Sequence, residues 1–422
     1  AALGVRRGGA LRWVANAAVD ILCASHTLQH TGEHLVLPIV EEFLTPWLQL
    51  VSHSHTPRLM WKNMMGCGMK GFSKTRWWSR WEVMKDLAVN FGELHAFVNK
   101  LIEDNVGGAT TQALHAVLST KEDQLQLELA LAMDMEVLCT TTYKMEGDGL
   151  EILLIHDALE DLRLRGRMLG TEAAHLPNAS AILRAKARIT IGMATMEYYE
   201  APHHTWFEGK ILALGHNSWT IGYPDGSTLV VNTEREIRAA VDVRALPEWQ
   251  PLLAQVNGAF TYLEARLTDN CAATYGCKEQ HRITGLLRAF NPAFAHGKVD
   301  ALWVQRLASL PCFGCIPHVD ALLLQEMPSY LNACQGVQVD VADPQAFATQ
   351  VLSWWASNHT RFPTWAEAAR IAMCLTPNSA SCERVFSLLA CMFGSLRSTS
   401  LADQVETSVM LRYNRNKRDG GC

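Results

Sequence analysis

The stretch that decides the fold spans residues 362–414, FPTWAEAARIAMCLTPNSASCERVFSLLACMFGSLRSTSLADQVETSVMLRYN. Its apolar residues recur at helical spacing, which predicts helices over Thr364–Cys374, Ser379–Met392 and Leu401–Tyr413. The second helix follows good N-capping residues and carries Glu383 in its first turn, where the helix dipole favours an acid. Taken alone, Glu383 is a helix-start glutamate.

The segment PNSASCERVFS, residues 377–387, resembles the C-terminal signature of hAT-superfamily DNA transposases. The resemblance implies an RNase H-like catalytic core that this segment completes, and a dimerisation surface. It makes Glu383 the positional equivalent of the last of three metal-binding carboxylates. The apolar positions expected to form the dimer surface lie on the last two helices: Phe386, Leu389, Met392, Leu401, Val405, Val409 and Leu411.

A second family block, DILCASHTL at residues 20–28, contains the Cys23-x-x-His26 motif. In the family, the first two catalytic acids lie upstream of this motif, and Asp20 does not occupy either position. Two-metal phosphoryl transfer needs several converging carboxylates, so Glu383 alone cannot hold both ions. We therefore expect an N-terminally truncated, non-catalytic relative with no cofactor. Mg²⁺ would be expected only in an intact transposase.

The cysteine and histidine pairs raise the question of zinc. Cys23 and His26 are half of a structural site, which normally needs four ligands. Cys312 and Cys315 with His318 form another half-site. We predict no metal site, and a buried Cys23 with a hydrogen-bonded His26 where a strand over 17–23 meets a helix.

The segment 61–85 carries six Lys or Arg residues and one acid, together with four tryptophans. Its sequence TRWWS resembles the family's Arg-Trp motif. The resemblance implies that Trp77 stacks on an extruded base while cations contact phosphate. The nucleic-acid-binding candidates are Lys74, Arg76, Trp77 and Arg80. The alternative interpretation is a helix whose tryptophans belong to the core.

Between residues 198 and 243 the apolar period changes from helical to alternating. Strands are predicted over 206–214, 218–223 and 227–231, with turns between them. The pattern resembles a Tudor or related SH3-like barrel, which can hold methylated lysine in an aromatic cage. The candidate cage residues are Tyr199, Trp206, Trp219 and Tyr223. The alternative is that these aromatics fill a small barrel core.

Composition indicates the general class of protein and its compartment. The 422 residues are 49% hydrophobic and 19% charged with a net charge of −5, which is typical of a globular chain without a global basic surface. Twelve scattered cysteines favour a reducing compartment. No uncharged apolar run reaches the roughly 18 residues of a membrane span. The glycine pattern at 66–71 is predicted to be a loop because no strand precedes it.

These observations predict a mainly α fold with an α/β part, in which an incomplete RNase H-like core is split by a helical insertion that carries an SH3-like barrel. Domain boundaries are predicted as 1–105 (partial core and start of the insertion), 106–195 (insertion), 196–245 (β-module), 246–343 (insertion continued) and 344–422 (closing helices and dimerisation region).

The predicted function is that of a hAT transposase-derived protein that forms a homodimer or higher homo-oligomer. The resemblance also implies DNA as a partner and a nuclear location. Two alternatives stay open. The chain could be the C-terminal part of an active metal-dependent transposase, or a chromatin-associated protein that acts through the β-module.

Overall fold

The computed structural model describes residues 22–72, 77–146, 150–169, 173–186, 195–200, 205–214, 218–232, 237–239, 242–270 and 276–377. The chain divides into two compact units. Unit 1 comprises residues 1–28, 141–161 and 264–422, and unit 2 comprises residues 29–140 and 162–263. Each unit is therefore assembled from segments that are far apart in the sequence.

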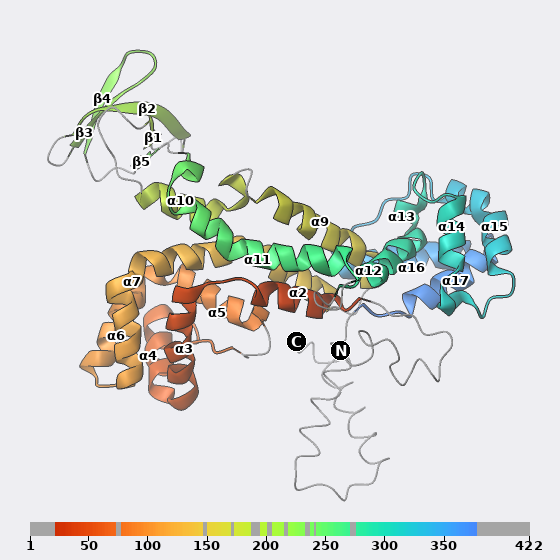
Figure 1. Cartoon of the computed structure of the whole chain (residues 1–422), viewed down its shortest axis with the longest axis horizontal. Helices are drawn as coiled ribbons and strands as arrows, with labels where there is room; N and C mark the ends of the chain where they lie inside the picture. The colour runs from red at the N-terminus through yellow and green to blue at the C-terminus, as the bar shows by residue number, and fades with distance from the viewer. Residues whose placement is uncertain are drawn as a thin grey trace, which may run out of the picture. The chain divides into compact units, whose positions relative to one another are not determined.

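Helices build most of unit 2 (Figure 1). Those that lie wholly in it are α3 (Pro38–His53), α4 (His55–Met65), α5 (Trp77–Val89), α6 (Leu94–Glu103), α7 (Ala109–Asp134) and α10 (Pro177–Lys186). Four helices have residues in both units: α2 (Ala24–Glu33), α8 (Glu136–Met145), α9 (Ile155–Met168) and α11 (Trp249–Thr268). Helix α7 packs against α3, α5, α6 and α10 and is the central element of the unit. Between α3, α4 and α6, the rings of Trp47, Trp61 and Phe97 meet edge to face.

Unit 2 also contains a five-stranded antiparallel sheet in the order β4-β3-β2-β1-β5. The strands are β1 (Thr195–Glu200), β2 (Thr205–Leu214), β3 (Ser218–Gly222), β4 (Thr228–Asn232) and β5 (Ile237–Ala239). Strand β2 is the longest, and its register with β3 shifts between Ile211 and Ala213. Such a bulge bends a strand. The first half of β2, up to Lys210, pairs with β1, and the second half, from Lys210, pairs with β3.

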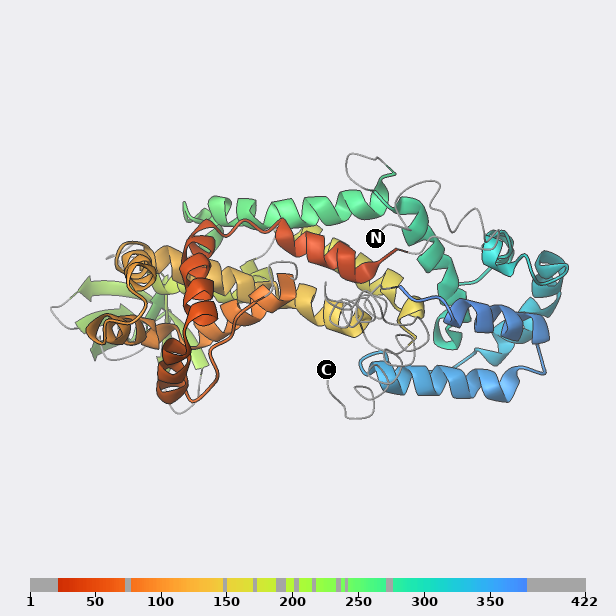
Figure 2. The same cartoon turned by 90° about the horizontal axis from the view of Figure 1, so that it is seen from below.

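Helices of the C-terminal part gather in unit 1, coloured teal to blue in Figures 1 and 2. They are α12 (Lys278–Leu287), α13 (Pro292–Ala295), α14 (Ala301–Ala308), α15 (Val319–Ala333), α16 (Pro344–Asn358) and α17 (Pro363–Met373). The core is aromatic. Tyr330 stacks on Trp355 and on Trp365, with ring centroids 5.5 and 4.2 Å apart. The Tyr330 hydroxyl donates a hydrogen bond to the carbonyl of Ala289.

In three helices that begin with a proline, the first backbone N–H groups donate hydrogen bonds to a carboxylate from another helix. Glu128 accepts from the backbone N–H groups of Ile39 and Val40 in α3. Asp134 accepts from Asn178 and Ala179 in α10. In unit 1, Glu326 accepts from Thr364 and Trp365 in α17. These carboxylates satisfy N–H groups that have no partner inside their own helix.

The mainly helical architecture with a small antiparallel sheet agrees with the sequence prediction. Strands β2, β3 and β4 were predicted within two residues of their ends, whereas β1 and β5 were not predicted. Helices α2 and α3 are separated by a short non-helical link that precedes Pro38. The predicted helices at 379–392 and 401–413, and most of the predicted strand at 17–23, lie outside the described residues.

No single described helix is long and apolar enough to cross a membrane. The bent pair of α2 and α3 satisfies the length and composition criteria only when the two helices are taken together.

Candidate functional site

Most of the residues predicted to act in catalysis and dimerisation lie beyond Pro377, outside the described residues. They are Glu383, Phe386, Leu389, Met392, Leu401, Val405, Val409 and Leu411. The described neighbours upstream of them are α16 and α17. Phe347 and Val351 of α16 and Trp365 of α17 are buried in the core of unit 1. Leu352, also in α16, has 50% of its surface exposed.

The predicted basic and aromatic segment is largely built into the fold of unit 2. Trp77 is only 5% exposed, and its backbone N–H donates to the Gln29 side chain. Gly32 lies directly against the Trp77 ring, where a Cβ atom would have no room. Trp81 is also buried and donates its indole N–H to the carbonyl of Ala132. Stacking of Trp77 on a base would therefore require the ring to leave the core.

Cations of this segment pair with acids of the same unit. Arg80 forms an ion pair with Glu41. The Nζ of Lys70 lies 3.3 Å from Glu82 and 3.1 Å from a carboxylate oxygen of Asp86. Burial lowers the pKa of Arg80 from its ordinary value. Lys74 and Arg76 lie outside the described residues. The described part of the segment thus offers less uncompensated positive charge than its sequence indicates.

The Cys-x-x-His motif lies at the start of α2. The Sγ of Cys23 and the Nδ1 of His26 are 3.1 Å apart, which confirms the predicted hydrogen bond. Cys23 is half-buried, so the prediction that it is buried was wrong. The hydroxyl of Thr27 donates to the carbonyl of Cys23, one turn earlier. The motif therefore stabilises the helix start. The glycine pattern at 66–71 is a loop, as predicted, with Gly66 in the left-handed conformation that ends α4.

The four aromatics proposed as a cage are distributed over three strands and a turn. Tyr199 in β1 is the register partner of Trp206 in β2. Trp219 in β3 pairs with Val231 and is half-buried. Tyr223 is also half-buried, and its backbone closes the turn to Ser227. Whether the four residues surround one cavity stays a prediction.

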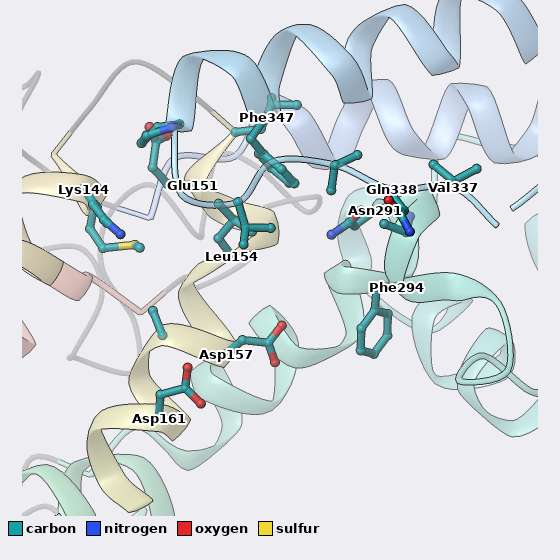
Figure 3. Close-up of a pocket in the computed structure, with 17 residues that line it drawn as sticks. Lys144, Glu151, Leu154, Asp157, Asp161, Asn291, Phe294, Val337, Gln338 and Phe347 are labelled. Atoms are coloured by element: carbon teal, nitrogen blue, oxygen red, sulfur yellow. Dashed lines mark hydrogen bonds between the residues drawn. The ribbon is translucent and has the colours of Figure 1, made fainter. Parts of the chain in front are cut away.

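A pocket of about 690 Å³ lies within unit 1 (Figure 3). Its walls come from the end of α8, the start of α9, α13, the segment before α16, and α16 itself. Asp157 and Asp161 project from successive turns of α9, and Phe294 lies across from them in Figure 3. Arg288 pairs with Asp157 and lies over the ring of Phe294, 4.3 Å from its centroid. The pocket therefore combines apolar walls with an acidic edge.

A cluster of two histidines and a glutamate lies on the first turns of α9 and α12, also in unit 1. The Nε2 of His281 is 2.6 Å from the Oε1 of Glu160. The rings of His156 and His281 stack with centroids 4.2 Å apart, and His156 Nδ1 contacts the carbonyl oxygen of His281. Burial, with the neighbouring His281 and Arg288, lowers the pKa of His156 to about 4. His156 is thus neutral at neutral pH.

Among the residues that the structure describes, His156, Glu160 and His281 are the one group of three His, Cys, Asp or Glu side chains whose ligand atoms converge. Cys312 is buried, whereas Cys315 is exposed and contacts the carbonyl of Cys312. His318 does not join them in such a group within the described ranges.

The comparison with known families finds one match, in the C-terminal part. Residues 335–414 match the hAT family C-terminal dimerisation region. This part of the chain is thus similar to the dimerisation region of that family. No curated protein matches the chain. The resemblance seen at residues 377–387 is therefore confirmed, while the RNase H-like core and the Tudor-like module stay predictions.

The hAT dimerisation region begins before α16 and contributes one wall of the pocket in unit 1. Val337, Gln338, Pro344 and Phe347 belong both to this region and to the pocket lining. Its described part, residues 335–377, is thus integrated into the core of unit 1.

Sequence reasoning missed the cluster of His156, Glu160 and His281. One signal was present, because a histidine and a glutamate four residues apart on a helix lie on the same face. The third member comes from a helix more than a hundred residues later, and only the fold brings it there.

Proposed function

We propose that this chain is a hAT transposase-derived protein whose function is self-association through residues 335–414. The match to the hAT dimerisation region carries the proposal. The burial of Phe347, Trp355 and Trp365 supports different roles for the two halves of that region. Residues 335–377 belong to the core of unit 1. Residues 378–414 supply the apolar side chains of the proposed contact between two copies of the chain.

This division can be tested by sedimentation equilibrium at micromolar concentration. The full chain is compared with a chain that ends at Pro377, which retains α16 and α17. The full chain is expected to form dimers or larger homo-oligomers, and the shortened chain is expected to sediment as a monomer. A full chain that is strictly monomeric would contradict the proposal.

Point variants locate the contact more finely. Leu389→Glu and Val405→Glu each place a charge on a predicted dimer position, so each is expected to weaken association at least tenfold because a buried, unpaired charge is costly. Val89→Glu is the matched control, because Val89 is a solvent-exposed residue of unit 2, 76% accessible, outside the matched region. Equal association of all three variants would place the contact elsewhere.

A second proposal concerns the β-module, because one observation favours it. The sheet has the strand order β4-β3-β2-β1-β5, a long and bulged second strand, and a last strand that returns to pair with the first, which supports a proposal of an SH3-like barrel. We infer that residues 195–239 form such a barrel and bind a methylated peptide. Titration of the full chain with a trimethyl-lysine peptide and its unmethylated counterpart tests this. Equal or absent binding of the two peptides would exclude the reader function.

A further inference from the structure

We propose that His156, Glu160 and His281 bind one divalent transition-metal ion of the zinc class. The inference is independent of the hAT relationship and departs from the sequence prediction, which assigns no metal to the chain. The ligand atoms of the three side chains all lie within 4.8 Å of one another. All three residues belong to unit 1, so the site is complete within one compact body.

The donor set fits zinc better than magnesium. Two imidazole nitrogens and one carboxylate oxygen are ligands that Zn²⁺ accepts, and three protein ligands leave a fourth position for water. Magnesium prefers an octahedral shell of oxygen atoms, so the two histidines disfavour it. The cluster is therefore chemically distinct from the carboxylate site of an intact transposase.

The fold positions the three side chains before any ion arrives. His156 and Glu160 are four residues apart on α9 and so lie on one face of the helix. His281, on the first turns of α12, is brought against both. Gly285, one turn after His281, leaves room for the His156 ring, because an added Cβ would lie 2.9 Å from its Cε1 and Nδ1 atoms.

The electrostatic surroundings favour a cation. Asp157 and Asp161 flank the two α9 ligands in sequence. A bound divalent ion would offset this concentration of negative charge.

The hydrogen bond between His281 and Glu160 also accounts for part of the cluster without a metal, so binding has to be measured directly. The full chain is freed of metal with a chelator and titrated with Zn²⁺ by calorimetry. Glu160→Gln is the principal variant, because the amide keeps the size of the side chain and its capacity to accept a hydrogen bond from His281. His156→Ala is the second variant.

His95→Ala serves as the control, because His95 also lies beside a glutamate, 3.3 Å from Glu122, on an exposed surface. The wild-type chain and the control are expected to bind one more equivalent of Zn²⁺ than Glu160→Gln and His156→Ala. The thermal midpoint of the wild type should rise with Zn²⁺ but not with the same concentration of Mg²⁺.

Cysteines elsewhere in the chain can also bind zinc, and Co²⁺ substitution separates the two cases. Cobalt at the proposed site should show visible absorption typical of four-coordinate Co²⁺ without thiolate charge-transfer bands, and the signal should disappear in Glu160→Gln. Equal zinc stoichiometry in wild type and folded Glu160→Gln, thiolate bands alone, or no binding by the wild type would each overturn the proposal.

Discussion

At the residue scale, the buried Glu128 and the half-buried Glu326 act as remote helix caps. Helices α3 and α17 begin with Pro38 and Pro363, and neither receives a side-chain hydrogen bond from its own N-cap residue. Glu128 and Glu326 supply the acceptors instead. The arrangement links each helix start to a distant helix, so one side chain contributes to both local and tertiary structure.

The cap on α17 leads to a quantitative prediction. Glu326→Ala removes the acceptor of two backbone N–H groups and of the Thr364 hydroxyl. Buried donors left without partners cost about 1–3 kcal/mol, so the free energy of unfolding should fall by that amount in urea titrations. Glu367→Ala is the control, because this half-buried residue forms a surface ion pair with the exposed Arg370, and the change should stay within about 0.5 kcal/mol. Equal effects of the two variants would refute the capping role.

The remote caps of unit 2 also make stability depend on pH. Burial raises the pKa of Glu128 above its ordinary 4.5, although the N–H donors of Val40 and Ile39 oppose the shift. Between 4.5 and the raised value, the folded chain binds more protons than the unfolded chain. The contribution of this group to stability is therefore highest at low pH and declines as pH rises through that window.

Glu128→Gln removes this titration. As pH rises from 4.5 to neutral, the wild type should lose stability relative to Glu128→Gln, and the difference should level off above the raised pKa. Thermal unfolding in a pH series measures the difference. Glu103→Gln, at an exposed position with 68% side-chain accessibility, should follow the wild type throughout. A constant difference between wild type and Glu128→Gln would contradict the assignment.

At the element scale, a glycine sets how closely α9 and α11 approach in unit 2. A Cβ atom at Gly166 would clash with the Cβ atom of Phe260 and with the Cγ and Cδ1 atoms of its ring. Glycine is otherwise unfavourable inside a helix, so its presence here is explained by the ring that packs on it. The sequence alone marks Gly166 only as a weak position in a helix.

The close approach predicts the sign of a substitution. Alanine normally stabilises a helix relative to glycine, but Gly166→Ala should lower the free energy of unfolding by about 1–3 kcal/mol because the Phe260 ring must move. Gly68→Ala is the matched control, since nothing lies within 4 Å of its added Cβ. Denaturant unfolding compares the two variants. A Gly166→Ala chain more stable than the wild type would show that the ring yields without cost.

At the scale of the whole molecule, self-association should be coupled to stability. A contact that forms only between folded chains stabilises the folded state by mass action. The thermal midpoint of the full chain should therefore rise with protein concentration. The midpoint of the chain that ends at Pro377 should not change with concentration. A full-chain midpoint that is independent of concentration would argue against an obligate dimer.

The sequence predicted the elements with strong local periodicity. Local spacing and capping residues predicted helix α17, strands β2 to β4, the loop at 66–71 and the contact of Cys23 with His26. The segment around Glu383 also predicted the similarity to the hAT dimerisation region, which the match over 335–414 confirms. These features depend on neighbours in the chain, which is why local patterns determine them.

Only the tertiary structure decided which residues meet. It buried Trp77, whose sequence context suggested an exposed stacking surface. It added β5 to the sheet beside β1, although only three residues form that strand. It also brought His281 within 2.6 Å of Glu160 across a separation of 121 residues. No local pattern encodes such contacts, because they depend on how helices from distant segments pack against one another.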